Sequence, residues 1–278
     1  MAIFHRCRTN VNYFLQICRI HAPPHFPMLP QKSYRFRISG TWLVLAFLLL
    51  GGSCSRWNLG DVGPITTVTR SVSGTGTIRI GQKFDIILQQ DTTRPESYTL
   101  EYPEKLIPHI VHEISNNTLS FKDENRGKWT QDLSLRPKIT LNLHQYHTLY
   151  IEGSSKWSCS DTLFGSALNI EMRSVMDQNL CINYNDVTGK CNNLGSLTLS
   201  GRGTLFSFSV EAGSQLNAQN MRCHDAYFWH FTQRDCYVSP EKQAFLYLYN
   251  SGNVYIKPSD FYRFESLEKG NGRIIYKP

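Results

Sequence analysis

The chain has 278 residues, of which 41% are hydrophobic and 18% charged, a composition typical of one or two globular domains. Its formal net charge of +7 comes almost entirely from the first 54 residues. This segment contains no Asp or Glu and six basic residues, namely Arg6, Arg8, Arg19, Lys32, Arg35 and Arg37. Of the 29 basic residues in the whole chain, 23 therefore remain beside 22 acidic ones, a balance of +1. A nucleic-acid-binding domain needs a basic face on its folded part, so the composition excludes nucleic acid as an expected partner.

The N-terminal segment has the organisation of an export signal. A basic stretch at residues 32–37 precedes an apolar run at residues 41–50, and small residues follow at positions 51–53. The apolar run has ten residues, fewer than the roughly 20 that cross a bilayer as a helix. We therefore predict a signal peptide over residues 28–53, with a single-pass membrane anchor as the alternative. Residues 1–27 are interpreted as an upstream mis-start or a disordered extension.

The cysteine at the end of this signal indicates a lipid attachment site. Its position resembles that of the lipidated cysteine in bacterial lipoproteins, although Leu50 lies four residues before Cys54 instead of the usual three. We predict that Cys54 carries a lipid and that residues 54–65 form a tether. The predicted location is the cell envelope, with the outer membrane favoured, on the periplasmic or the cell-surface side.

The cysteines beyond the tether do not form a recognisable framework. They are five in number, and they are Cys159, Cys181, Cys191, Cys223 and Cys236. An odd number cannot pair completely within one chain, and the spacings include no CxxC pair of the kind that binds zinc. We interpret them as buried or free thiols, although the exported compartment would permit disulfides.

Residues 66–148 have the pattern of a strand-rich N-terminal β region. Apolar and polar residues alternate with a period of two in segments such as Phe84–Leu88, Tyr98–Tyr102 and Ile139–Leu143. Turn-forming residues separate these segments, and no apolar period of 3.6 residues persists for three turns. The sequence therefore predicts an all-β fold with little helix.

Residues 149–278 repeat with a period near 20. Turn-like positions recur in steps of 20, 20, 20, 20, 19 and 18 residues, at Gly153, Arg173, Asn193, Gly213, Gln233, Gly252 and Gly270. Short alternating strands lie between them, and no proline occurs from Lys138 to Ser239. Central strands that donate every backbone N–H to a ladder exclude proline in this way. The period predicts a β-solenoid, in which each coil packs only on its neighbours; a meandering β-sandwich is the alternative.

Several short motifs, in order and spacing, resemble one known family. They are the opening from Val68 through Phe84–Gln90, the segment Asn116–Phe121, the coil Leu149–Ser154, and the two last coils Ser251–Ile256 and Gly270–Pro278. Together they resemble the auto-transporter adhesin head family with the GIN domain, which is common in Bacteroidota lipoproteins. The resemblance runs from about Thr67 to Pro278 and implies a β-solenoid-like fold and an envelope location.

The polar residues do not predict a catalytic or metal site. His109 and His112 share an HxxH spacing with His144 and His147, but residues three apart on a strand point to opposite faces. The neighbouring residues Cys223, His224 and Asp225 diverge on a strand for the same reason, so they cannot form a thiol nucleophile with its base. The carboxylates Asp161, Asp177, Asp186, Asp225 and Asp235 fall at different phases of the repeat. We therefore expect no enzyme, no metal and no cofactor.

An aromatic segment is the one candidate binding patch. Tyr227, Trp229 and Phe231 alternate with Phe228 and His230, so the two sets point to opposite faces of a strand. Three more aromatic residues follow one coil later, at Phe245, Tyr247 and Tyr249. Exposed aromatic rings can stack on sugars or anchor protein contacts, but they can also pack against a neighbouring segment. The sequence leaves both interpretations open.

Taken as a whole, the sequence predicts a non-catalytic envelope lipoprotein with an adhesin-like β-repeat domain. Its expected partners are the membrane, through the lipid on Cys54, and a glycan or protein ligand. A periplasmic structural or regulatory module is the second hypothesis. A polysaccharide-active enzyme is the third, because solenoids can carry such sites where carboxylates cluster on one face.

Overall fold

The computed structural model describes residues 62–125, 134–257, 261 and 263–277. These residues belong to one compact unit, Asn58–Pro278. The predicted leader over residues 1–27, the signal peptide over residues 28–53 and the lipid attachment site Cys54 lie outside the described residues.

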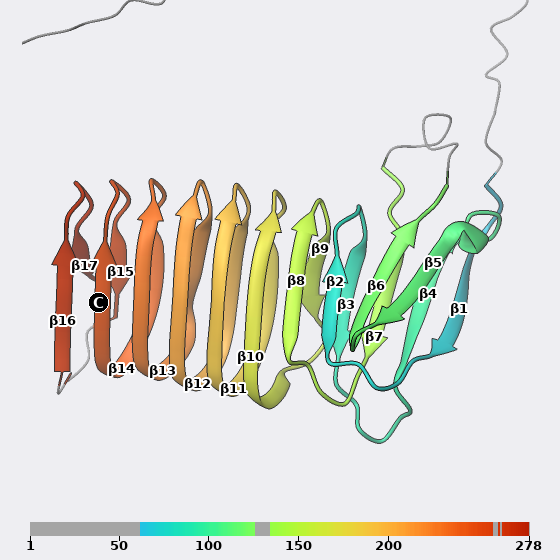
Figure 1. Ribbon diagram of the computed structural model, residues 1–278, viewed down its shortest axis with the longest axis horizontal. Coiled ribbons are helices and arrows are strands. Elements are labelled where there is room, and N and C mark those ends of the chain that lie inside the picture. Colours follow the sequence, from blue (N-terminus) through green and yellow to red (C-terminus); the bar gives the residue numbers. More distant parts are fainter. Residues whose placement is uncertain (1–61, 126–133, 258–260, 262, 278) are drawn as a thin grey trace, which may run out of the picture. The chain divides into compact units, whose positions relative to one another are not determined.

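The described part of the chain is almost entirely strand, joined into one sheet (Figure 1). The first group of elements contains β1 (Ile65–Ser71), β2 (Thr77–Ile80), β3 (Asp85–Gln89), β4 (Ser97–Pro103), the 3₁₀ turn η2 (Ile107–His109), β5 (Ile110–Ser115), β6 (Thr118–Asp123) and β7 (Lys138–Asn142). The second contains β8 (Thr148–Gly153), β9 (Lys156–Cys159), β10 (Leu163–Ser174), β11 (Gln178–Asn193), β12 (Ser196–Ala212), β13 (Gln215–Thr232), β14 (Cys236–Leu248), β15 (Val254–Ile256), β16 (Arg263–Glu268) and β17 (Ile274–Tyr276). The predicted all-β class is confirmed.

The strands stack as a β-solenoid of about six turns with coils near 20 residues, as the repeat predicts. Each coil bends once, so it contributes a first arm to one flat face and a second arm to the other. In β11 the arms are residues 178–184 and 186–193, and in β13 they are residues 215–223 and 225–232. Neighbouring coils pair in parallel along both arms. Figure 1 shows the resulting row of rungs.

The register explains the sequence period. One inward column of the second arm runs through paired residues at spacings of 19, 19, 20 and 18, and it consists of Met172, Cys191, Val210, His230 and Leu248. All five side chains are fully buried. A coil therefore tolerates a change of one residue in length, provided that the same inward position returns to the column.

Parallel stacking also extends into residues 66–148. β2 lies between β8 and β6, and β3 lies between β9 and β7, all in parallel register. The N-terminal end of this stack is then covered by antiparallel pairs, because β5 pairs with β6 and β4 pairs with β7 and β1. An uncovered parallel edge would present unpaired backbone groups, and these antiparallel strands occupy it.

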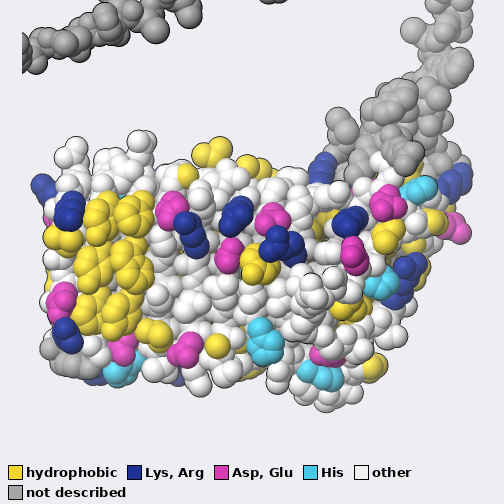
Figure 2. Space-filling model, in the orientation of Figure 1, with side chains coloured by type: hydrophobic (Ala, Val, Ile, Leu, Met, Phe, Trp, Pro, Cys, Tyr) yellow, Lys and Arg dark blue, Asp and Glu magenta, His cyan; other side chains and the backbone are white. Residues whose placement is uncertain are grey.

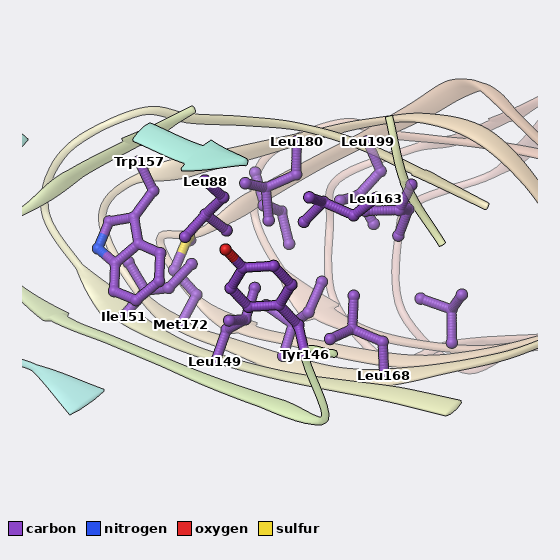
Figure 3. Packing of buried hydrophobic residues seen from close by; sticks show 14 of the residues in the cluster. Leu88, Tyr146, Leu149, Ile151, Trp157, Leu163, Leu168, Met172, Leu180 and Leu199 are labelled. Atoms are coloured by element: carbon purple, nitrogen blue, oxygen red, sulfur yellow. The ribbon is translucent and has the colours of Figure 1, made fainter. Parts of the chain in front are cut away.

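The core lies between the two faces. Leucines of the first arm, such as Leu180 and Leu199, point toward Leu149 and Leu168 of the second arm (Figure 3). Two of the largest buried side chains in this core, Tyr146 and Trp157, have hydrogen-bond partners for their polar groups. The Tyr146 hydroxyl lies 2.7 Å from the carbonyl oxygens of Gln89 and Leu141, and the Trp157 indole N–H donates to Ser155 Oγ at 2.9 Å. Such bonds offset the cost of removing these groups from water.

Candidate ligand-binding face

The alternation in β13 and β14 determines which aromatic residues face outward. In the second arm of β13, Ala226, Phe228 and His230 are buried, and the residues between them point away from the core. β14 repeats the pattern one coil later, with Ala244, Leu246 and Leu248 inward. The outward residues form one group on this face, which we call the aromatic ladder, and it consists of Tyr227, Trp229, Phe231, Phe245, Tyr247 and Tyr249. Figure 2 shows it as the large hydrophobic patch over β13 and β14.

The rings of the ladder pair across the two strands. Tyr227 stacks on Phe245 with centroids 4.5 Å apart, and Phe231 stacks on Tyr249 at 4.6 Å. Trp229 and Tyr247 form the middle pair at 5.9 Å. The interplanar angles are 6°, 11° and 16°. Parallel rings whose centres are this close cannot lie flat beside each other, so they stand on edge with their faces along the solenoid axis. Offset stacking of this kind stabilises the two coils by about 0.5–1.5 kcal/mol per pair beyond burial.

The terminal coil covers one end of the ladder with cations. The Arg263 guanidinium lies 5.0 Å from the centroid of Phe245, and Lys269 Nζ lies 5.6 Å from that of Tyr249. Leu267 pairs with Tyr247 between them. Cations over aromatic faces are attracted by the ring quadrupole. Arg263 and Lys269 could not be assigned to the ladder from the sequence, because their contacts with Phe245 and Tyr249 depend on how the last coil pairs with β14, which the spacing of turns does not give.

The opposite end of the ladder meets small polar side chains. Ser207, Ser209 and Glu211 of β12 pair in register with Tyr227, Trp229 and Phe231. A serine side chain is too short to cover an aromatic ring, so Ser207 and Ser209 do not continue the ring stack on the β12 side of Tyr227 and Trp229. At the third position, Glu211 accepts from Lys190 Nζ at 2.7 Å.

The ladder combines stacking with exposure. Phe231 and Tyr249 keep 38% and 37% of their surface exposed, while Tyr227, Trp229 and Tyr247 are half-buried and Phe245 is buried. The predicted patch Tyr227, Trp229 and Phe231 is thus one side of a larger group whose ring edges face solvent. Clustered exposed aromatic side chains are typical of ligand and partner sites.

The adjacent nucleophile and base do not assemble. Cys223 is buried and its thiol faces the Ser239 carbonyl oxygen at 3.7 Å, whereas His224 is exposed and its Nδ1 lies 2.8 Å from Asp225 Oδ1. Burial raises the pKa of Cys223 to about 12. A thiol in that environment stays protonated at neutral pH, and the imidazole lies on the other side of the strand.

The histidine pairs have separate structural contacts. His112 Nδ1 lies 3.0 Å from the Tyr98 hydroxyl, and burial lowers the pKa of His112. His144 Nε2 donates to the Arg94 carbonyl oxygen at 2.8 Å. His109 and His147 are exposed. Within the described ranges, no group of three or more His, Cys, Asp or Glu side chains is arranged to hold a metal ion.

Two of the scattered carboxylates link successive turns. Asp177 Oδ1 accepts the backbone N–H of Ser196 at 3.0 Å, and Asp235 Oδ1 accepts that of Asn253 at 2.8 Å. Asn253 Oδ1 in turn accepts the Arg273 N–H at 3.0 Å. Asp177 and Asp235 are therefore hydrogen-bonded within the turns and do not point into a common cleft.

The five cysteines are free thiols in the structure. Cys191, Cys223 and Cys236 are buried, and burial raises the pKa of Cys236 to about 12. Cys159 and Cys181 are partly buried, and burial raises the pKa of Cys159 to about 11.

Comparison with protein families identifies the chain. Residues 75–259 match the family model described as "Putative auto-transporter adhesin, head GIN domain". The chain belongs to this family. The match covers both arms of β13 and β14, so the aromatic ladder lies within the GIN domain. Comparison with curated proteins finds no match.

Solved structures share the fold of this GIN domain at low sequence identity. An adhesin from Bacteroides fragilis has a TM-score of 0.68 and 15% identity, and the alignment covers 77% of this chain and 97% of that one. An adhesin from Parabacteroides merdae has a TM-score of 0.53 and 12% identity, covering 78% and 98%. A lipid-binding protein from Parabacteroides distasonis has a TM-score of 0.52 and 15% identity, covering 77% and 97%. In each case the protein's role is assigned only provisionally. At these identities the likeness shows the fold alone.

No helix in the described part of the GIN-domain chain is both long and apolar enough to cross a membrane. The apolar run at residues 41–50 lies outside that part.

Proposed function

We propose that the chain is a non-catalytic, lipid-anchored envelope protein that binds a glycan through the aromatic ladder. The observation that carries this proposal is the stacked group of six outward aromatic residues on β13 and β14. The family supports an adhesin-like role at the envelope. The export signal and Cys54 supply the anchor in this proposal.

The geometry favours a sugar ligand beside the ladder. The β12-facing sides of Tyr227 and Trp229 border Ser207 and Ser209, so a pyranose ring can stack there and bond its hydroxyl groups to serine. The exposed ring edges of Phe231 and Tyr249 extend the apolar surface along the strand. Successive outward positions on a strand are about 7 Å apart, so the three rows suit several units of a chain.

Binding of soluble neutral polysaccharides tests the ladder. The full chain, purified in detergent, is run by affinity electrophoresis through gels that contain xyloglucan, galactomannan or mannan. We expect retardation by at least one polymer and about a tenfold loss of affinity in Trp229→Ala, the loss typical of a central aromatic contact. Phe164→Ala is the matched control, because Phe164 is 56% exposed on β10, away from the ladder.

Two results would contradict the glycan. Equal losses of affinity in Trp229→Ala and Phe164→Ala would show that the ladder does not bind the polysaccharide. Absence of retardation, together with a protein cross-linked to the wild type but not to Trp229→Ala, would make the ladder a protein interface.

The cellular location and the lipid anchor are tested separately on intact cells of the native host. We expect wild-type protein to carry lipid and to be cleaved by added protease, and Cys54→Ala to lose the lipid. A lipidated but protected protein would favour the periplasmic structural or regulatory module. A Cys54→Ala variant that fractionates like wild type would overturn the lipid anchor.

A further inference from the structure

A second candidate site lies on the opposite face of the solenoid, in the first arm of the last coils. It is a groove of about 190 Å³ between β13, β14 and β15. Its lining consists of Gln219, Asn220, Tyr237, Val238, Tyr255, Ile256, Lys257 and Lys277. The groove is separate from the aromatic ladder, whose residues occupy the second arm.

A break in the register creates this groove. Five residue steps along β13, from Asn217 to Arg222, face only two steps along β14, from Tyr237 to Ser239. The surplus residues bulge from the sheet, and Gln219 and Asn220 are exposed there. A bulge bends the strand and redirects its side chains, which is why bulges occur beside binding sites. β15 ends at Ile256, and Lys257 lines the groove directly after it.

The walls of the groove are aromatic and its rim is cationic. Tyr237 stacks on Tyr255 with centroids 5.0 Å apart and an interplanar angle of 15°. Lys277 Nζ lies 5.3 Å from the centroid of Tyr237, and Lys257 is exposed beside it. Val238 and Ile256, whose side chains are buried, form the floor.

The charge of the groove is one-sided. The described residues that line it include two lysines and no carboxylate. Asp235, two residues before Tyr237, accepts the Asn253 backbone N–H at 2.8 Å. Two ammonium groups favour a ligand that carries a carboxylate or sulfate. The Gln219 and Asn220 amides offer both donors and acceptors, as hydroxyl groups require.

We propose that this groove binds an acidic saccharide unit of a longer polysaccharide. Its volume is well below the roughly 300–1,000 Å³ of pockets that enclose whole drug-sized ligands, so it suits one ring of an extended chain. The tyrosine rings supply an apolar wall for the sugar, the amides bond its hydroxyl groups, and Lys257 and Lys277 neutralise its acid group. This site does not depend on the function proposed for the ladder.

The test uses polygalacturonate, dextran sulfate and a neutral galactan in affinity electrophoresis of the full chain in detergent. We expect the wild type to be retarded by at least one of the acidic polymers and not by the neutral galactan. The double variant K257Q/K277Q should bind about tenfold more weakly, the effect of losing about 1.4 kcal/mol of charge-assisted bonding. Tyr255→Leu should also weaken binding, because it keeps apolar area but loses the ring.

The double variant K83Q/K156Q is the charge-matched control, since both lysines are exposed and neither lines the groove. Trp229→Ala should leave acidic-polymer binding unchanged, which separates this site from the ladder. Thermal unfolding of each variant confirms that it is folded. The proposal is overturned if neither acidic polymer retards the wild type, or if the two double variants lose affinity equally. Binding to anionic phospholipid vesicles without binding to either polysaccharide would also overturn it, by identifying a lipid headgroup as the ligand.

Discussion

Two neighbouring regions of the same face differ only in what points outward. β11 and β12 carry polar outward residues such as Lys190, Ser209 and Glu211, whereas β13 and β14 carry the aromatic ladder. All four strands pair in parallel, and their inward residues in the second arm are almost all buried apolar side chains. The difference shows that the inward column determines the solenoid, while outward positions are free to carry a binding surface.

Removing an inward ring should have the largest effect on stability. Phe208 on β12 is fully buried and stacks on Phe206 with centroids 4.7 Å apart. We expect Phe208→Ala to lower the free energy of unfolding by about 3–5 kcal/mol through lost burial and a cavity. Chemical denaturation measures this change. Ser209→Ala, the outward neighbour, should change it by less than about 0.5 kcal/mol. Equal effects at the two positions would refute the division between inward and outward residues.

A backbone contact between polar coils should come next. Gly201 on β12 has φ of +124°, and a Cβ there would clash with the Ile182 carbonyl oxygen of β11. We expect Gly201→Ala to destabilise the protein by about 1–3 kcal/mol, the cost of strained backbone. Gly74→Ala is the control, because Gly74 has φ of +69° but no atom within 4 Å of the added carbon. If Gly74→Ala costs as much, conformation alone and not the contact explains the loss.

The inward column contains one histidine, His230, which makes the aromatic coils sensitive to acid. His230 is fully buried; its Nε2–H donates to the Arg234 carbonyl oxygen at 2.9 Å, and its Nδ1 has no hydrogen-bond partner among the described residues. Burial lowers the pKa of His230, with Arg234 O and Asp235 acting in the opposite direction. A positive imidazolium would be desolvated between Val210 and Leu248, its partners in the column.

The sign of the effect follows from linkage. The unfolded chain takes up a proton near pH 6.5, while folded His230 takes it up only at lower pH. Stability should therefore be fully present above about pH 6.5 and fall as the pH drops toward the folded pKa, by up to about 1.4 kcal/mol per pH unit. Denaturation between pH 5 and 8 measures the slope. His230→Leu should reduce it, and His224→Gln, at an exposed position, should not.

The sequence predicts the solenoid well because inward alternation and the spacing of turns are local signals. Phe206, Phe208 and Val210, for example, mark an inward column without knowledge of their neighbours. The pairing of β2 with β8 could not be predicted, since about 70 residues separate them and the alternation carries no partner identity. The bulge at Gln219 and Asn220 was missed for a similar reason. The bulge arises because fewer residues of β14 lie opposite this part of β13, and the sequence of β13 alone does not reveal that difference.

For the candidate site, the sequence predicts which aromatic residues share a face but not their stacking. Tyr227 and Phe245 pair across an 18-residue step, whereas the two preceding steps at this position have 19 and 20 residues, so the spacing of the sequence does not by itself give the register that stacks the rings.

Replacing one ladder residue with the polar residue found at the paired position of β12 should lower stability by less than the changes at Phe208, Gly201 and His230. Tyr227→Ser places on β13 the residue that β12 carries at the paired position, Ser207. We expect a loss of about 1 kcal/mol of stability, because the stack on Phe245 disappears while the inward column stays intact. Phe245→Ser in the same background should then cost less than it does alone. Additive losses in this double-mutant cycle would show that the two rings do not stabilise each other.

Loss of the ion pair between Lys190 and Glu211 should have the smallest effect on stability, and this effect should depend on salt concentration. Lys190 Nζ lies 2.7 Å from Glu211 Oε1, with side chains 49% and 30% exposed, so the ion pair is largely hydrated. We expect Lys190→Gln to cost about 0.5 kcal/mol or less in dilute buffer and nothing measurable in about 1 M NaCl, where the Debye length is roughly 3 Å. Tyr227→Ser should keep its cost at both salt concentrations, since ring stacking is not screened. Denaturation at the two ionic strengths makes the comparison, and a salt-independent cost for Lys190→Gln would mean that its methylene chain packs on the coil beside it. Polar coils would then be held together partly by apolar contact, as the aromatic coils are.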